Sequence, residues 1–153
     1  MKSFLNELEK QGSTNQRVTV TTHTMIVRTI FYKEKPRKNL VNLIDYRPGG
    51  NDFRVPLRDA YEKCCNCHSD FDKLILYFMS DGTGNHPWSS INLFSDHRFR
   101  NKIEFHCVGF GDFDLRNLKR IAQGMPNGNL THALTAAELE RSMLRIIPNL
   151  YSS

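Results

Sequence analysis

Continuous apolar runs alternate with helical patterns along the chain, and the two patterns predict different elements. Residues 74–79 and 103–110 are almost entirely apolar, which predicts two buried strands. Residues 17–33 are rich in β-branched and aromatic side chains and predict two strands that meet around His23 to Met25. The chain is therefore expected to begin its sheet with a hairpin-like pair and to add buried strands further on.

Between these strands, apolar side chains recur three or four positions apart, as on one face of a helix. The last helical segment has the most complete local signature. Thr135 and Glu138 form a capping box, and Leu134 and Leu139 are placed as its hydrophobic staple. The expected helices are residues 2–10, Leu57 to His68, Pro87 to Phe94 or Phe99, Leu115 to Ile121 and Thr135 to Ile147, with a helical or irregular piece from Leu40 to Ile44.

The order of these elements predicts the fold class. Strands that alternate with helices are typical of parallel βαβ units, in which helices cover both faces of the sheet. We therefore expect a three-layer α/β fold with a mostly parallel sheet, and one antiparallel edge strand from the opening hairpin. At 153 residues, the chain is expected to form a single domain over residues 1–153.

The composition narrows the class of protein. No stretch approaches the ~18 continuous apolar residues of a membrane span. The N-terminal segment has charges spaced through it and lacks the apolar core of a secretory signal. Three of the four cysteines crowd into residues 64–67, which does not make a disulfide framework. We therefore expect reduced thiols in an intracellular, cytoplasmic protein, with a nuclear location left open.

A family resemblance rests on four stretches: GGNDFRVPLRDAY (49–61), LILYFMSDG (74–82), IEFHCVGFGDFDLRNLKRIA (103–122) and GNLTHALTAAELERSM (128–143). Taken together, these stretches resemble the von Willebrand factor A (vWA) domain. They follow the order of that family and together span most of the chain. The resemblance implies a Rossmann-like fold and a non-enzymatic module that binds a protein partner through the loops at the carboxyl ends of its strands.

The resemblance also implies a metal-ion-dependent adhesion site at the top of the sheet. In the family, this site combines an Asp-x-Ser-x-Ser loop, a threonine in a second loop and an aspartate in a third. Asp81 matches the third-loop acid, and Asn51 stands in place of the threonine, but the sequence contains no Asp-x-Ser-x-Ser. Because Mg²⁺ requires near-octahedral oxygen coordination, we expect a degenerate site and no cofactor unless the missing first loop is supplied.

The missing loop belongs to a strand that is central in the family. Residues 2–10 match the helix that follows this strand, so the chain is expected to be an N-terminally truncated vWA domain. Without the strand, the edges at residues 17–23 and 74–79 would carry unpaired backbone groups. Three outcomes stay open: further residues lie upstream, the two edges pair with each other, or a partner donates a strand.

The loops at the carboxyl ends of the strands supply the expected partner-binding rim. Tryptophan is enriched at binding hot spots, which makes Trp88 a candidate anchor. We favour the alternative that the Trp88 ring packs against the sheet at the start of the helix that follows. The expected rim consists of Asn51, Asp52, Asp81, Thr83, His86 and Trp88.

A different class of function also stays open, that of a small basic nucleic-acid-binding protein. Lysine and arginine outnumber aspartate and glutamate by 21 to 16. Binding of this kind would weaken steeply with salt, because contacts to phosphates release counterions. The candidate contacts are Lys33, Lys35, Arg37, Lys38, Arg98, Arg100 and Lys102.

The candidate nucleophiles and metal ligands do not combine into a catalytic site. Cys64, Cys67 and His68 have the spacing of zinc ligands, but no second pair lies at a matching distance. Cys107 lies in an apolar strand and has Phe113 where a phosphatase loop would require arginine. Ser80 lies outside any Gly-x-Ser-x-Gly sequence. We therefore expect no enzymatic activity.

Overall fold

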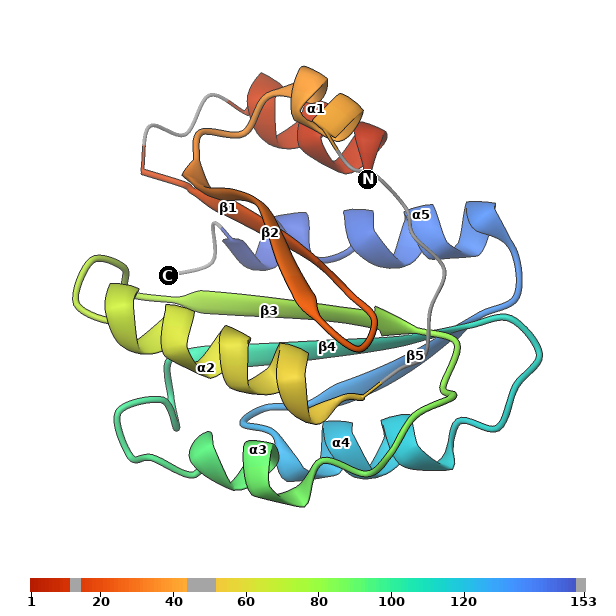
Figure 1. The fold of residues 1–153 in the computed structure, drawn as a ribbon. Coiled ribbons are helices and arrows are strands. Elements are labelled where there is room, and N and C mark those ends of the chain that lie inside the picture. The colour runs from red at the N-terminus through yellow and green to blue at the C-terminus, as the bar shows by residue number, and fades with distance from the viewer. Residues whose placement is uncertain (12–14, 44–51, 151–153) are drawn as a thin grey trace.

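The computed structural model describes residues 1–11, 15–43 and 52–150 (Figure 1). The strands are β1 (Val18–His23), β2 (Val27–Glu34), β3 (Leu74–Ser80), β4 (Ile103–Phe110) and β5 (Asn129–Ala133). The α-helices are α1 (Lys2–Lys10), α2 (Arg54–Cys67), α3 (Trp88–Leu93), α4 (Arg116–Gly124) and α5 (Ala136–Leu144). Two 3₁₀ helices, Lys38–Leu43 and Ile147–Leu150, complete the described elements.

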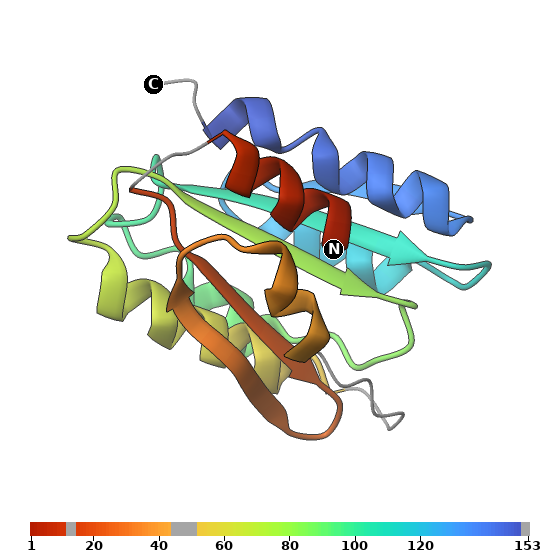
Figure 2. The same ribbon diagram turned by 90° about the horizontal axis from the view of Figure 1, so that it is seen from above.

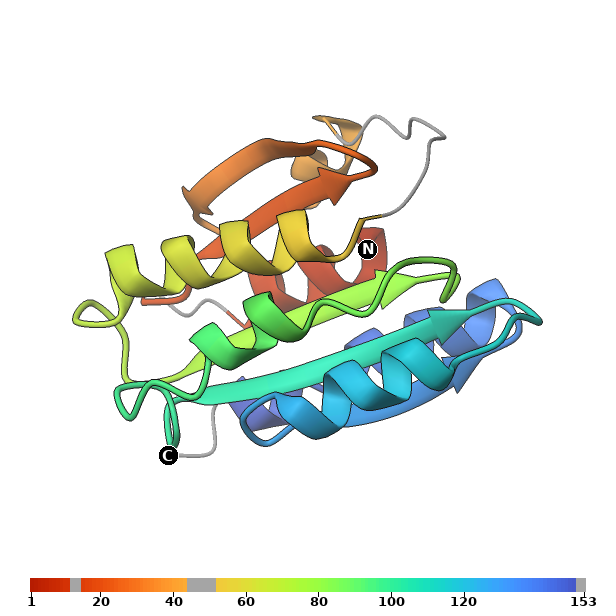
Figure 3. The same ribbon diagram turned by 60° about the horizontal axis from the view of Figure 1, so that its bottom comes forward.

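The described strands form two separate sheets. β3, β4 and β5 pair in that order, all in parallel, whereas β1 and β2 form an antiparallel hairpin. The expected parallel α/β core is confirmed, but the hairpin does not extend the same sheet as an edge. The physical reason is that no described strand bridges β1 and β3, and these two do not pair with each other. Figure 3 shows the two sheets apart, with β3 as the strand of the parallel sheet nearest the hairpin.

Helices cover both faces of the parallel sheet, as the alternation of elements predicts. α1 and α5 lie on one face, and α2, α3 and α4 lie on the other (Figures 1 and 2). Most of these elements lie close to their expected positions. α3 is shorter than expected and ends at Leu93, and Phe99 is buried in the turns that follow it. β5 is not predicted by the apolar pattern.

The main hydrophobic core joins the parallel sheet to the helices. Its largest fully buried side chains include Phe53, Phe94, Phe99 and Phe105. The Tyr61 ring from α2 meets Phe94 and Phe99 edge to face, with centroids 5.5 and 5.7 Å apart. Aromatic pairs in this geometry add about 1 kcal/mol each beyond their buried area. These contacts fix α2 and the segment around α3 against each other.

A second, smaller core lies between α1 and the hairpin. Leu5 of α1 and Leu40 of the first 3₁₀ helix are buried there. Val18, Val20 and Ile30 of the hairpin pack against them and remain partly exposed. The hairpin, α1 and this 3₁₀ helix thus share a core of their own, which we call the N-terminal unit.

His23, the last residue of β1, joins the N-terminal unit to the parallel sheet. Its ring stacks on Phe78 of β3, with centroids 5.3 Å apart and planes 12° apart, and meets the edge of Phe53 at 6.3 Å. Among the described residues, Nδ1 is buried with no hydrogen-bond partner. Burial lowers the pKa of His23 below its ordinary value of 6.5, against smaller opposing effects of the Met79 backbone and Asp81.

The expected capping box of the last helix is confirmed in its Thr135 half, and the Glu138 half is displaced by one residue. The Glu138 N–H donates to Thr135 Oγ1 at 3.2 Å, and the Leu134 N–H donates to Glu138 Oε2 at 2.8 Å. The carboxylate thus accepts from the residue before the N-cap. The expected staple is not buried, because Leu134 is 58% exposed. The start of α5 is therefore stabilised by polar capping and not by the hydrophobic staple.

We predict that Thr135→Ala lowers the free energy of unfolding by about 1 kcal/mol, since the Glu138 N–H loses its acceptor. Thr135→Ser keeps a hydroxyl in the same place and is expected to retain most of the stability. Urea denaturation of the three proteins measures the difference. An equal loss in both variants would contradict a capping role for the hydroxyl.

We predict that His23→Phe makes the protein less sensitive to mild acid. The pKa of His23 is lower in the folded protein than its ordinary value of 6.5, so the unfolded chain binds the proton more tightly. The stability is therefore full above about pH 6.5 and falls as the pH drops toward the lower, folded pKa. Phenylalanine keeps the stacking without the proton site.

Urea denaturation between about pH 8 and pH 5 tests this, because histidine titrates in that range. The control is His97→Gln, since the His97 side chain is 95% exposed. The control is expected to keep the wild-type dependence on pH. If the stability of His23→Phe depends on pH as the wild type does, the His23 side chain is not the cause of that dependence.

Candidate functional site

The loops that follow β3 and β4 leave the parallel sheet at the same edge. Ser80 at the end of β3 lies opposite Gly109 of β4, so the chain emerges from both strands side by side. The loops also touch, because a Cβ at Gly82 would lie 2.8 Å from the Asp114 carbonyl oxygen. Gly82 has φ +87°, a conformation that suits glycine. Ligands of open α/β sheets bind at this edge.

Asp81 orders the first of these loops. Its Oδ1 accepts hydrogen bonds from the Thr83 N–H at 3.0 Å and from Thr83 Oγ1 at 2.7 Å. This is the turn chemistry by which aspartate bonds to the backbone two residues on. Asn51, the other expected metal ligand, lies outside the described residues. Within the described ranges, no three His, Cys, Asp or Glu side chains gather closely enough to hold a metal ion.

Asp52 is engaged at the start of α2. It is 8% exposed, and its carboxylate accepts from Arg54 Nε at 2.9 Å and Arg54 Nη2 at 2.6 Å. The hydrogen bond from the Arg54 guanidinium holds the pKa of Asp52 below its usual range. The acid is therefore already neutralised by its neighbour, and its side chain offers little surface to a partner.

Trp88 is exposed, contrary to the favoured expectation that it packs against the sheet. The buried side of α3 runs through Ser90 and Ile91, which leaves Trp88 to one side and 60% exposed. Its ring lies against His86, with centroids 4.3 Å apart. Both His86 ring nitrogens are buried and lack a hydrogen-bond partner among the described residues. Burial, and secondly the charge of Arg120, lower the pKa of His86, so a neutral ring supports the indole.

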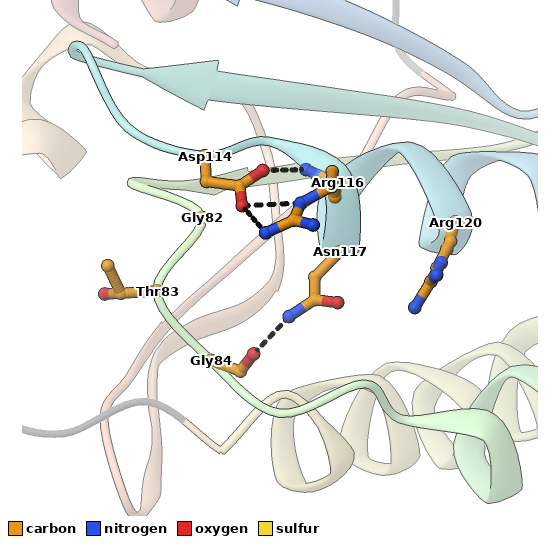
Figure 4. A pocket seen from close by; sticks show the side chains of 7 residues that line it. All are labelled: Gly82, Thr83, Gly84, Asp114, Arg116, Asn117 and Arg120. Atoms are coloured by element: carbon orange, nitrogen blue, oxygen red, sulfur yellow. Dashed lines mark hydrogen bonds and ion pairs between the residues drawn. The ribbon is translucent and has the colours of Figure 1, made fainter.

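A cavity of about 430 Å³ opens between the loop after β3 and helix α4 (Figure 4). One wall is the segment Gly82 to Gly84, and the other carries Asp114 and the α4 side chains Arg116, Asn117 and Arg120. Asn117 Nδ2 donates to the Gly84 carbonyl oxygen at 2.7 Å and ties the two walls together. We call this cavity the α4 pocket.

The two arginines of the α4 pocket differ in their partners. Arg116 donates through Nε and Nη2 to Asp114 Oδ2, both at 2.6 Å. This hydrogen bonding raises the pKa of Arg116 and lowers that of Asp114. Arg120 has no ion pair or hydrogen bond with the rest of the described chain. Arg116, Asn117 and Arg120 are not predicted as site residues, because nothing local in the sequence indicates that α4 faces the loop after β3.

Several cations that were candidates for nucleic-acid binding are engaged in ion pairs or hydrogen bonds within the chain. Lys33 Nζ lies 2.8 Å from Asp70 Oδ2, and Arg98 Nη2 lies 2.6 Å from Asp96 Oδ2. Arg37 Nη2 lies 3.4 Å from Glu34 Oε2, and Lys102 Nζ donates to the His68 carbonyl oxygen. These charges are partly offset within the chain, which does not favour a continuous basic surface.

The buried thiols have little nucleophilic character. Burial raises the pKa of Cys107 and of Cys64 to about 12. A thiol with such a pKa is almost fully protonated at neutral pH, and the thiolate is the reactive form. His68, which shares the zinc-like spacing, has Nδ1 3.0 Å from the Cys65 carbonyl oxygen.

Comparison with known proteins gives no family for this chain. No family model and no curated protein matches it. A solved structure described as an uncharacterized membrane spanning protein from Vibrio fischeri is similar, with 17% sequence identity and a TM-score of 0.41. The match covers 99% of this chain and 81% of that one. This level of likeness carries no argument about fold or function.

Among residues 1–11, 15–43 and 52–150, no helix is both long enough and apolar enough to cross a bilayer.

We predict that Asp81→Ala lowers the free energy of unfolding by about 1 kcal/mol, because Thr83 loses its acceptor. Asp81→Asn keeps an oxygen acceptor without the charge and is expected to lose less than about half as much. Urea denaturation compares both variants with the wild type. A loss in Asp81→Asn as large as in Asp81→Ala would show that the negative charge, and not the turn, is what matters.

Proposed function

We propose that the chain is a non-enzymatic protein-interaction module of vWA type. It binds a protein partner through the loops at the carboxyl ends of its strands. The observation that carries this proposal is the exposed indole of Trp88 packed against the half-buried ring of His86. Tryptophan is among the residues most enriched at interface hot spots. The parallel sheet with helices on both faces is compatible with the family that the sequence resembles.

The contact surface that we propose consists of Thr83, His86 and Trp88, with Asp81 ordering the loop between them. Thr83 is exposed beside the turn that Asp81 forms. Asn51 belongs to this rim through the resemblance alone, and Asp52 contributes less because Arg54 already occupies its carboxylate. Direct polar and aromatic contacts are favoured over metal bridging, since Asp81 and Asn51 cannot complete the coordination that Mg²⁺ requires.

A second mode of contact is strand addition at the outer edge of β3. Within the described chain β3 pairs with β4 alone, and its apolar residues Leu74, Ile75 and Leu76 remain partly exposed. Free edges of this kind accept an extended segment of another chain through backbone hydrogen bonds. We propose this edge as the place where a partner or a further copy would add a strand.

We predict that Trp88→Ala weakens partner binding by about 30-fold, as expected for a hot-spot residue worth ~2 kcal/mol. A photo-crosslinking amino acid at position 88 is expected to capture a discrete protein in cells. Purified wild-type protein should compete with this capture, and purified Trp88→Ala should compete poorly. The affinity loss is then measured with the captured protein.

The matched control places the same crosslinker at Tyr32, an aromatic residue of the hairpin that is 40% exposed. The proposal expects no competable capture from this position. Equal capture from positions 32 and 88, or competition by Trp88→Ala as strong as by the wild type, would refute an anchoring role for Trp88.

A further inference from the structure

The α4 pocket carries an excess of positive charge that the anionic groups of the described chain do not neutralise. Two guanidinium groups, those of Arg116 and Arg120, face the cavity with a single carboxylate, that of Asp114. The two arginines are one helical turn apart on α4, so their charges repel. In the described chain, only Arg116 has a compensating anion. An anion in the pocket would offset this repulsion.

Arg116 is already oriented for such a contact. Asp114 holds its guanidinium through Nε and Nη2, which leaves Nη1 for another acceptor. A guanidinium fixed in this way loses less conformational freedom when it binds a ligand. Figure 4 shows Arg116, Asn117 and Arg120 extending from α4 on the side that faces Gly82 to Gly84. Asp114 thus acts on the pocket as a positioning residue.

The charge of the pocket selects the kind of anion. A guanidinium fork matches the geometry of both carboxylate and phosphate. Asp114 lies in the same pocket and repels a doubly charged group more strongly than a singly charged one. The excess of one positive charge is therefore best matched by a carboxylate.

The pocket is also joined to the proposed rim. Gly82 to Gly84 form one wall of the pocket and lead along the chain to His86, whose ring contacts Trp88. In agreement with this arrangement, the charge of Arg120 contributes to the lowered pKa of His86. A partner segment that reaches the indole can therefore place a neighbouring side chain near Arg120.

We infer that the α4 pocket binds the carboxylate of an aspartate or glutamate in a protein partner, beside the apolar side chain that contacts Trp88. This inference rests on the proposed function, and it adds that the partner is recognised by its acidic side chain. Arg120 supplies the unpaired charge, and Arg116 and Asn117 supply further donors.

Backbone amide NMR titration with the capped tripeptide Leu-Glu-Leu tests the inference. The amides of Gly82 to Gly84 and of α4 are expected to shift. The glutamine analogue and the Arg120→Gln variant should each weaken binding about tenfold or more, because each removes a charge-assisted contact. The matched control is Lys119→Gln, which removes the same charge from an exposed neighbouring position on α4 and should bind normally.

Three results would overturn the inference. They are an absence of shifts in the pocket, an equal loss in Lys119→Gln, and tighter binding of a phosphoserine tripeptide than of the glutamate one. Amide dispersion of the free Arg120→Gln variant confirms that its fold is intact. Binding of the glutamate tripeptide that depends on Arg120, together with failed capture at Trp88, would support the pocket and refute the proposed function. Successful capture at Trp88 without such binding would support the proposed function and refute the carboxylate site in the α4 pocket.

Discussion

Backbone pairing along β4 is the constraint on which the candidate site depends. β4 has a parallel partner on each side, β3 and β5, and most of its side chains are buried. Its register with β3 sets Ser80 opposite Gly109, and this brings the two following loops together. The contact of Gly82 with Asp114, the bond from Asn117 to Gly84 and the cavity between them all follow from that register.

The parts of the fold that the sequence predicts well are those specified by local residues. The apolar run of β4 predicts a buried strand from its own residues alone. The capping interactions at Thr135 and Glu138 act within one turn of helix. β5 has no such signal. Its sequence NLTHA contains only Leu130 and Ala133 as apolar residues, so its strand conformation depends on pairing with β4.

The candidate site was less predictable, because it depends on contacts between distant residues. The rim around Asp81, Thr83 and His86 follows from the position of a loop after a buried strand. The exposure of Trp88 does not, since a tryptophan at the start of a helix can turn either way. Arg116 and Arg120 meet the loop after β3 only through the sheet register. Their one local signal is a spacing of four residues on a helix, which is common on solvated surfaces.

The separate core of the N-terminal unit has a consequence for how the chain reaches its fold. Within this unit the hairpin closes a short loop, because β1 ends at His23 and β2 begins at Val27. The parallel sheet instead needs pairing between segments about thirty residues apart, such as Leu74 with Ile103. During synthesis, the N-terminal unit leaves the ribosome before the strands of the parallel sheet and can assemble while these strands are still being made. We therefore expect the aromatic contact of His23 with Phe78 to form late, after the hairpin and the parallel sheet have each paired.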